Sequence, residues 1–212
     1  MVTIEVNKNN LRLIEKRLGN MQSKSKNVLK KAVNDTAKQA RKEIAQQAQK
    51  TYVVKGGKFN RAMKIKRASN SNLVAIISAT GGAMELKDFR VSPASYKTGD
   101  QRPNVVKAKV LKSSSMKQLV KGDIKAFVAK FSNGHVSVLQ RKGKKRLPVK
   151  KLLSPSIPKM LGNEKRVYKI VKPTINKNLR ANINKHIRKV LGAWYDSILF
   201  TRRFNRWIEK SI

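Results

Sequence analysis

Basic side chains are concentrated between positions 141 and 151, where seven of eleven residues are lysine or arginine. They are Arg141, Lys142, Lys144, Lys145, Arg146, Lys150 and Lys151. No acidic residue occurs between Asp123 and Glu164, so nothing in this stretch of sequence neutralises them. Guanidinium and ammonium groups in such a run bind phosphates or carboxylates, although many such runs are simply solvated loops. Because this run follows a predicted strand and precedes a proline-containing connection, we predict a fixed cationic patch.

The positive charge extends over the whole chain. Fifty Lys and Arg against eleven Asp and Glu give a formal charge of +39 over 212 residues. A second candidate patch consists of Arg61, Lys64, Lys66 and Arg67. Self-repulsion at this charge opposes both compactness and the association of identical copies. We therefore expect DNA, RNA or an acidic protein surface to be near the protein in its working state.

Residues that could perform acid-base or metal chemistry are sparse and scattered. His135 falls at a predicted hairpin turn and His186 in a basic helix, and neither has a second histidine at metal-binding spacing. We interpret His135 as a polar residue of the turn and His186 as a residue on the solvated face of its helix. Glu85 and Asp88 are the one close acidic pair, which we interpret as local polarity at a strand end. The sequence predicts no enzyme, no metal and no cofactor.

Cysteine is absent, which excludes disulfides and thiolate metal sites and fits a reducing compartment. No apolar run approaches the roughly 20 residues that span a bilayer. We expect a soluble protein that is made in the cytoplasm and has no membrane partner.

Apolar periodicity predicts two long helices. Between Ser25 and about Lys50, apolar and small residues recur with a period near 3.6, and the small residues permit close approach of another element. From Val167 to Trp194 a second stripe recurs at steps of three or four. Pro173 within it should either kink this helix or begin its main part as the first helical residue.

The strand signals lie mostly between the two helices. Residues 62–68 and 73–79 predict one hairpin, 105–112 a further strand, and 124–131 with 135–142 a hairpin turning at Ser132–Gly134. Residues 90–103 have no periodicity and predict a long exposed loop. The expected fold class is α+β: a central antiparallel sheet with two long helices packed on it, plus an amphipathic C-terminal helix. We expect residues 1–161 to form one α+β domain and 162–212 a helical arm that either belongs to the same domain or packs on a neighbour.

The end of the chain is rich in aromatic residues on two helical faces. Six residues are the expected subunit interface: Trp194, Tyr195, Phe200, Phe204, Trp207 and Ile208. One face would pack within the chain, and the other would cover a second subunit or lie on a membrane surface beside nearby arginines. We favour the subunit contact, because large aromatic residues are common at protein interfaces and the chain has no other interfacial signal.

Three segments together resemble the prophage minor tail protein Z family: 32–44, 63–69 and 122–161. The third carries the specific pattern, an AFxAxxxxGHxxVxxRxGKxRLPI hairpin followed by a proline-rich ending. Twelve residues stand where that pattern expects them: Phe127, Gly134, His135, Val138, Arg141, Gly143, Lys144, Arg146, Leu147, Pro148, Ser156 and Pro158. Leu153 and Ser154 replace the usual small residue and glycine before Pro155.

The resemblance implies a virion protein, related to tail-completion and neck proteins of long-tailed phages. It implies a homo-oligomeric ring, often of six copies, at the head-proximal end of the tail. Its neighbours would be the tail tube or tail terminator protein, the head-tail connector proteins and the phage DNA end, after assembly in the host cytoplasm. The two basic patches would then meet DNA or acidic neighbouring rings.

Other interpretations remain open at this point. Arg141 and Arg146 could instead fix the hairpin to the loop that follows it. The chain could also be a free DNA-binding or DNA-packaging factor, which would bind duplex in isolation with a steep salt dependence. A nuclease would require metal-dependent turnover without a carboxylate cluster.

Overall fold

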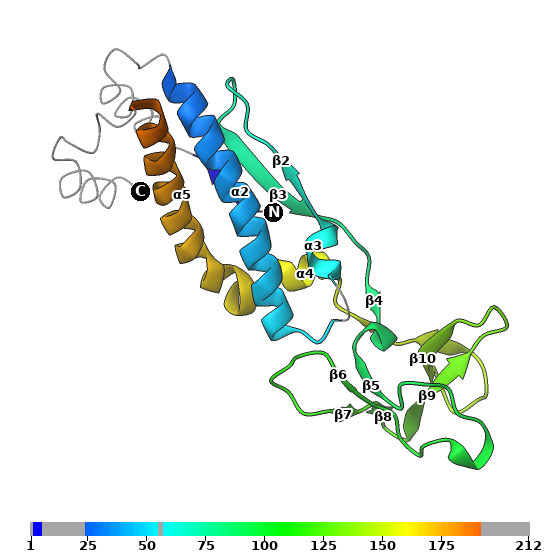
Figure 1. Ribbon diagram of the computed structural model, residues 1–212. Helices are drawn as coiled ribbons and strands as arrows, with labels where there is room; N and C mark the ends of the chain where they lie inside the picture. Colours follow the sequence, from blue (N-terminus) through cyan, green and yellow to red (C-terminus); the bar gives the residue numbers. More distant parts are fainter. Residues whose placement is uncertain (1, 6–23, 55–56, 192–212) are drawn as a thin grey trace. The chain divides into compact units, whose positions relative to one another are not determined.

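The structure is a computed structural model that describes residues 2–5, 24–54 and 57–191 (Figure 1). The chain divides into two compact units. Unit 1 comprises Met1–Ile44, Met63–Ala79 and Tyr168–Ile212, and unit 2 comprises Ala45–Ala62 and Thr80–Val167. The helices and the antiparallel strands confirm the α+β class.

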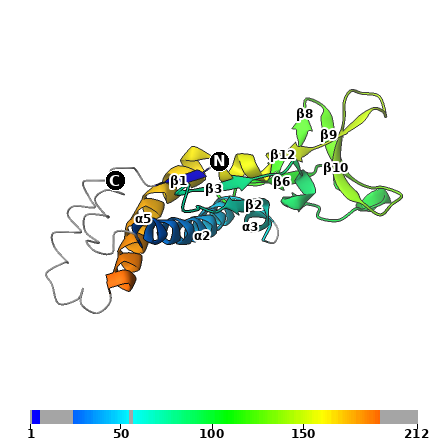
Figure 2. The same ribbon diagram turned by 90° about the horizontal axis from the view of Figure 1, so that it is seen from above.

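Unit 1 contains most of the long helix α2, Ser25–Thr51, at the position where the sequence predicts it. Its stripe of small residues is fully buried, with Ala32, Ala37 and Ala40 at 0% exposure. Helix α5, Lys169–Leu191, lies beside it (Figures 1 and 2). Short side chains at the contact allow the two backbones to approach closely.

Helix α5 follows directly on a π-helical turn, η4, Glu164–Tyr168. The predicted apolar stripe is confirmed by the burial of Val171, Ile175, Leu179, Ile183 and Ile187. Pro173 is the fifth residue of α5, so it lies inside the helix, and of the two predicted alternatives it does not begin the helix. Proline has no N–H to donate, and its place one turn into the helix costs α5 one backbone hydrogen bond.

Polar side chains also connect α2 and α5. Asn182 donates to the Thr36 hydroxyl at 3.0 Å and to the Gln39 side chain at 2.9 Å. His186 Nε2 lies 2.9 Å from the Asp35 carboxylate. The interpretation of His186 as a solvated residue is therefore wrong, because its side chain is only 9% exposed and faces α2.

The sheet of unit 1 has the strand order β1-β3-β2. Its strands are β1, Val2–Glu5; β2, Met63–Lys66; and β3, Val74–Ala79, all antiparallel. Strands β2 and β3 form the predicted hairpin. Asn34 of α2 accepts from the Ala68 N–H at 2.8 Å and donates to the Ala68 carbonyl at 3.1 Å, which fixes α2 to the end of this hairpin.

In the described ranges unit 2 contains three further small antiparallel sheets, so the described strands do not form the one central sheet expected from the sequence. Strands β9, Ile124–Lys130, and β10, Val136–Arg141, form the predicted hairpin and are flanked by β8, Val120–Lys121, and β11, Val149–Lys151. A second sheet has β6, Lys107–Lys109, between β5, Arg90–Ser92, and β7, Lys117–Gln118. A third pairs β4, Met84–Glu85, with β12, Leu153–Ser154. This unit also contains the short helical segments α3, Lys58–Ala62; α4, Ile157–Leu161; η2, Leu86–Asp88; and η3, Gly99–Gln101.

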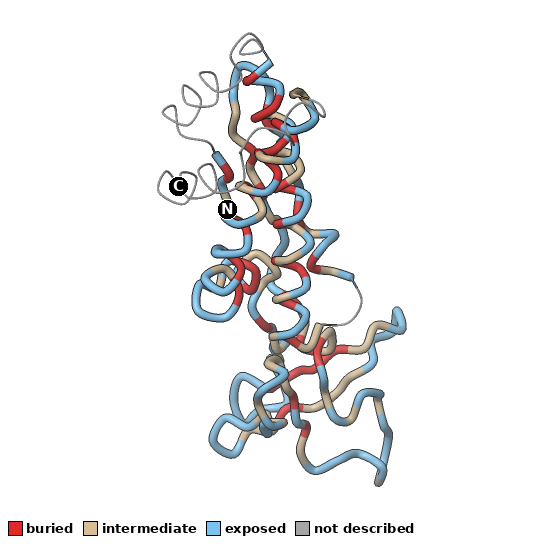
Figure 3. Tube along the Cα trace, turned by 60° about the vertical axis from the view of Figure 1, so that its left-hand side comes forward, coloured by how far each residue is buried: buried red, intermediate tan, exposed pale blue. Residues whose placement is uncertain are grey.

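One buried cluster of unit 2 consists of Leu86, Val106, Ala108, Ala126 and Val138. Phe59, Phe89 and Met160 of the same unit are also buried. In Figure 3 the trace of this unit carries short buried segments separated by long exposed stretches. Part of the loop predicted at 90–103 is strand β5, which the sequence does not signal because Val91 is the single strongly apolar residue of this strand.

Candidate functional site

The basic run lies on a hairpin loop between β10 and β11. Arg141 pairs with Val149 across the two strands, and the Lys142 N–H donates to the Pro148 carbonyl at 2.9 Å. The backbone at the base of the loop is therefore closed by hydrogen bonds. Lys150 and Lys151 continue on β11. The basic run therefore lies on a loop whose two ends are paired in the sheet, and its fixed position stays a prediction.

The side chains of the loop point into solvent. Every residue from Arg141 to Pro148 is exposed, and the apolar Leu147 is 67% exposed. Within the described part of the chain, none of Arg141, Lys142, Lys144, Lys145, Arg146 and Lys150 forms a salt bridge. Exposed cations without an acidic neighbour remain available to an anion from outside the chain.

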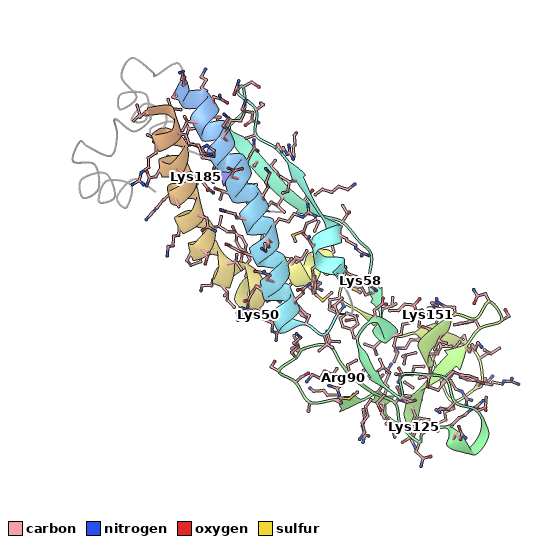
Figure 4. The ribbon with its side chains drawn as sticks, in the orientation of Figure 1. Lys50, Lys58, Arg90, Lys125, Lys151 and Lys185 are labelled. Carbon is pink, nitrogen blue, oxygen red and sulfur yellow. The ribbon has the colours of Figure 1, made fainter. Side chains whose placement is uncertain are left out.

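Lys151 differs from the rest of the run. Its ammonium group lies 3.2 Å from the Glu85 carboxylate and 5.6 Å from the centre of the Phe131 ring. Figure 4 labels Lys151 and Lys125 among the side chains that project around the strands of unit 2. Lys151 thus holds β11 against the β9–β10 hairpin and its turn, in addition to contributing charge.

The alternative role of Arg141 and Arg146, fixing the hairpin to the loop after it, would require side-chain contacts. Among the described residues, neither guanidinium has a hydrogen-bond or salt-bridge partner. Backbone bonds and Lys151 hold the hairpin and its neighbouring strand instead.

The four cations of the second predicted patch divide between the two units. Arg61 ends α3 in unit 2, whereas Lys64 and Lys66 on β2, with Arg67 after it, belong to unit 1. All four are exposed. Lys64 and Lys66 are two residues apart on a strand and so project to the same side of the sheet.

A polar cluster around Glu85 was not predicted from the sequence. The Glu85 carboxylate accepts from the Ser137 hydroxyl at 2.8 Å and lies 3.0 Å from His135 Nε2, in addition to its contact with Lys151. Lys87 Nζ lies 2.9 Å from His135 Nδ1. The interpretation of His135 as simple turn polarity is wrong, because its ring connects the turn to β4.

The same contacts set the titration of Glu85. Burial by itself would raise the pKa of this carboxyl, but the hydrogen bonds from Ser137, Lys151 and His135 and the charge on His135 outweigh it and lower the pKa. The neighbouring acid Asp88 serves a different contact, a 2.8 Å salt bridge to Lys58. Glu85 and Asp88 therefore do not act as a pair, and each holds its own part of unit 2.

The Glu85 cluster lacks the geometry of a hydrolase site. Ser137 and His135 each bond to the carboxylate and not to each other, so the histidine does not activate the hydroxyl. Ser137 is also fully buried. Across the described ranges there is no group of three or more His, Asp or Glu residues that could hold a metal ion.

The predicted subunit-interface residues, Trp194, Tyr195, Phe200, Phe204, Trp207 and Ile208, lie outside the described residues. Among the helices that the structure describes, none is long and apolar enough to cross a membrane.

Together these features define a strongly cationic α+β protein whose exposed charges are presented by a closed hairpin loop. The family model of prophage minor tail protein Z matches residues 14–193, and the chain belongs to this family. The resemblance inferred from the hairpin pattern is thereby confirmed, and the family gives the chain a structural role in a phage tail. No curated protein and no solved structure matches the chain.

Proposed function

We propose that the protein completes or terminates the tail tube at its head-proximal end, as a ring of copies that contacts DNA or the adjacent rings. The observation that carries this proposal is the loop 141–148, whose exposed cations have no acidic partner in the described part of the chain. A structural tail protein with such a loop requires an anionic surface next to it.

Charge also constrains how copies could assemble. Each copy carries +39, so identical subunits repel one another unless phosphate or acidic protein lies between or beside them. The DNA end and acidic rings both satisfy this requirement. The ring would form in the cytoplasm of the host and remain in the virion.

The subunit contact is assigned to the aromatic residues 194–208, which lie just beyond the segment that the family model matches. This part of the proposal rests on the sequence pattern. Replacing Phe204 and Trp207 by serine should lower the oligomeric mass measured by mass photometry. An unchanged oligomeric mass would show that the subunit interface lies elsewhere in the chain.

The decisive experiment is cryo-electron microscopy of the purified particle. A ring of this chain at the head-proximal end of the tail, with residues 141–151 facing the channel or an acidic neighbour, is the expected result. Absence of the chain from finished particles, together with salt-sensitive DNA binding by the free protein, would contradict the proposal and favour an assembly or packaging factor.

A further inference from the structure

A groove of about 640 Å³ lies in unit 2 beside strand β9. Its lining includes every residue from Asp123 to Lys130, together with Tyr96 and Arg102–Asn104 of the loop before β6. Arg141, Gly143 and Lys144 complete it. Successive residues of a strand point to opposite faces, so a groove that touches all of them runs along the edge of β9.

The hydrogen-bond pattern shows that this edge is open. The Phe131 N–H donates to His135, across the hairpin, whereas the Ala126 N–H donates to Leu119 on the opposite side. In an antiparallel pair, successive residues direct their N–H and C=O groups alternately toward the partner strand and away from it. The N–H and C=O groups of Val128 and Lys130 therefore face away from β10.

Strand β8 pairs with β9 only at Lys125 and Ile124. Among the described residues no strand covers the edge of β9 beyond Ala126. An uncovered edge of this kind is a template for an added strand.

The groove is cationic. Five basic residues line it, Arg102, Lys125, Lys130, Arg141 and Lys144, against one acidic residue, Asp123. All five are exposed, and none forms a salt bridge among the described residues. An occupant of this groove should therefore be acidic.

This chain cannot itself supply such an occupant. Apart from Glu85 and Asp88, no two of its eleven acidic residues are fewer than eight positions apart. Glu85 and Asp88 are already engaged within unit 2. A second copy would therefore bring more positive charge and no acidic strand.

Nucleic acid fits the edge less well than a peptide does. The edge of a strand presents alternating N–H donors and C=O acceptors, whereas a phosphate backbone offers acceptors to the protein. A peptide strand provides both kinds of group at the spacing that the edge requires.

We propose that the open edge of β9 takes up an extended acidic segment of a different protein by strand addition. This inference deepens the proposed function, on which it rests, because it names the site and the chemistry by which a neighbouring tail protein is bound. Backbone pairing would give the register of the added strand, and the surrounding cations would select acidic side chains.

The test is amide hydrogen exchange of the full-length, isotope-labelled protein with a synthetic heptapeptide of alternating glutamate and valine at about 0.15 M salt, where exposed charges are partly screened. Exchange at Val128 and Lys130 should slow at least tenfold. Phe127 and Ala129 are internal controls, because their N–H groups already face β10. Unchanged exchange at Val128 and Lys130 would overturn the proposal.

Two further probes separate strand addition from charge attraction. A heptapeptide with the same side chains in which every backbone amide is N-methylated, so that neither edge can donate, should not slow exchange; equal slowing would overturn strand addition. A short DNA duplex should also leave Val128 and Lys130 unprotected, and protection by DNA would assign the groove to nucleic acid.

Matched variants distinguish failure of this inference from failure of the proposed function. Lys125→Glu with Lys130→Glu should weaken peptide binding at least tenfold, whereas Lys142→Glu with Lys145→Glu, the same change of charge outside the groove, should change it less than threefold. Equal effects would contradict a defined groove. If the peptide does not bind but the chain forms a head-proximal ring, the inference fails and the proposed function stands.

Discussion

The hydroxyl of Ser137 donates a 2.8 Å hydrogen bond to the carboxylate of Glu85, across 52 positions of the sequence. Ser137 is fully buried, and the Glu85 side chain is 21% exposed. This one carboxylate also contacts His135 and Lys151, so it joins β4, the hairpin turn and β11.

Glu85→Ala should therefore destabilise unit 2. It leaves the buried Ser137 hydroxyl without its acceptor, which costs about 1–3 kcal/mol in the free energy of unfolding. Chemical denaturation of the variant measures this loss. The double variant Glu85→Ala with Ser137→Ala should be more stable than the sum of the two single losses predicts, because the unpaired hydroxyl is then absent. Strictly additive losses of stability would show that the two residues are not coupled.

Acid should destabilise the protein through the same carboxylate. The pKa of Glu85 is lowered from its ordinary value of 4.5, and that of Asp35 from 3.8. A lowered carboxyl pKa contributes stability that is complete above the ordinary value and is lost as pH falls through the lowered one. The melting temperature should fall below about pH 4.5, and the slope should be shallower in Glu85→Gln. Identical pH profiles would exclude this role for Glu85.

Asn182→Ala should weaken the contact between α2 and α5. Asn182 is 4% exposed and its amide group donates to both Thr36 and Gln39. Removing these bonds from a buried position should cost about 1–3 kcal/mol in the free energy of unfolding. Asn176→Ala, on the exposed side of the same helix, is the control and should change stability by less than about 0.5 kcal/mol.

Two glycines near the hairpin offer a matched pair. Gly134 has φ +79° in the turn between β9 and β10, a conformation that costs other residues about 1–2 kcal/mol. Gly143 has nothing within 4 Å of an added Cβ and does not have a positive φ in the strained range. Gly134→Ala should therefore lower the melting temperature, and Gly143→Ala should not. Equal effects would mean that the backbone of the turn does not require glycine.

The loop cations can be tested by their salt dependence. If the loop binds DNA, replacing Lys142, Lys144, Lys145 and Arg146 by alanine should reduce the slope of log Kd against log salt by about 0.9 for each phosphate that the variant no longer neutralises. Fluorescence anisotropy with a labelled duplex measures this slope. An unchanged slope would indicate that the loop binds acidic protein and not DNA.

The sequence by itself determined the features that repeat over short distances. The 3.6-residue period of α2 and α5, the hairpin of β9 and β10, the basic run and the family pattern around it could all be predicted. Each depends on neighbouring residues, because helix periodicity, turn chemistry and charge density are local properties.

The tertiary structure decided which long-range partners meet. The sequence contained no signal that Glu85 would meet Ser137 and His135, that His186 would be buried against Asp35, or that Lys151 would pair with an acidic residue. Strand β9 has the pattern of an ordinary hairpin strand, and only the sheet order shows that its outer edge is uncovered by the described strands beyond Ala126. These outcomes depend on packing between segments far apart in the chain, and a local pattern does not specify that packing.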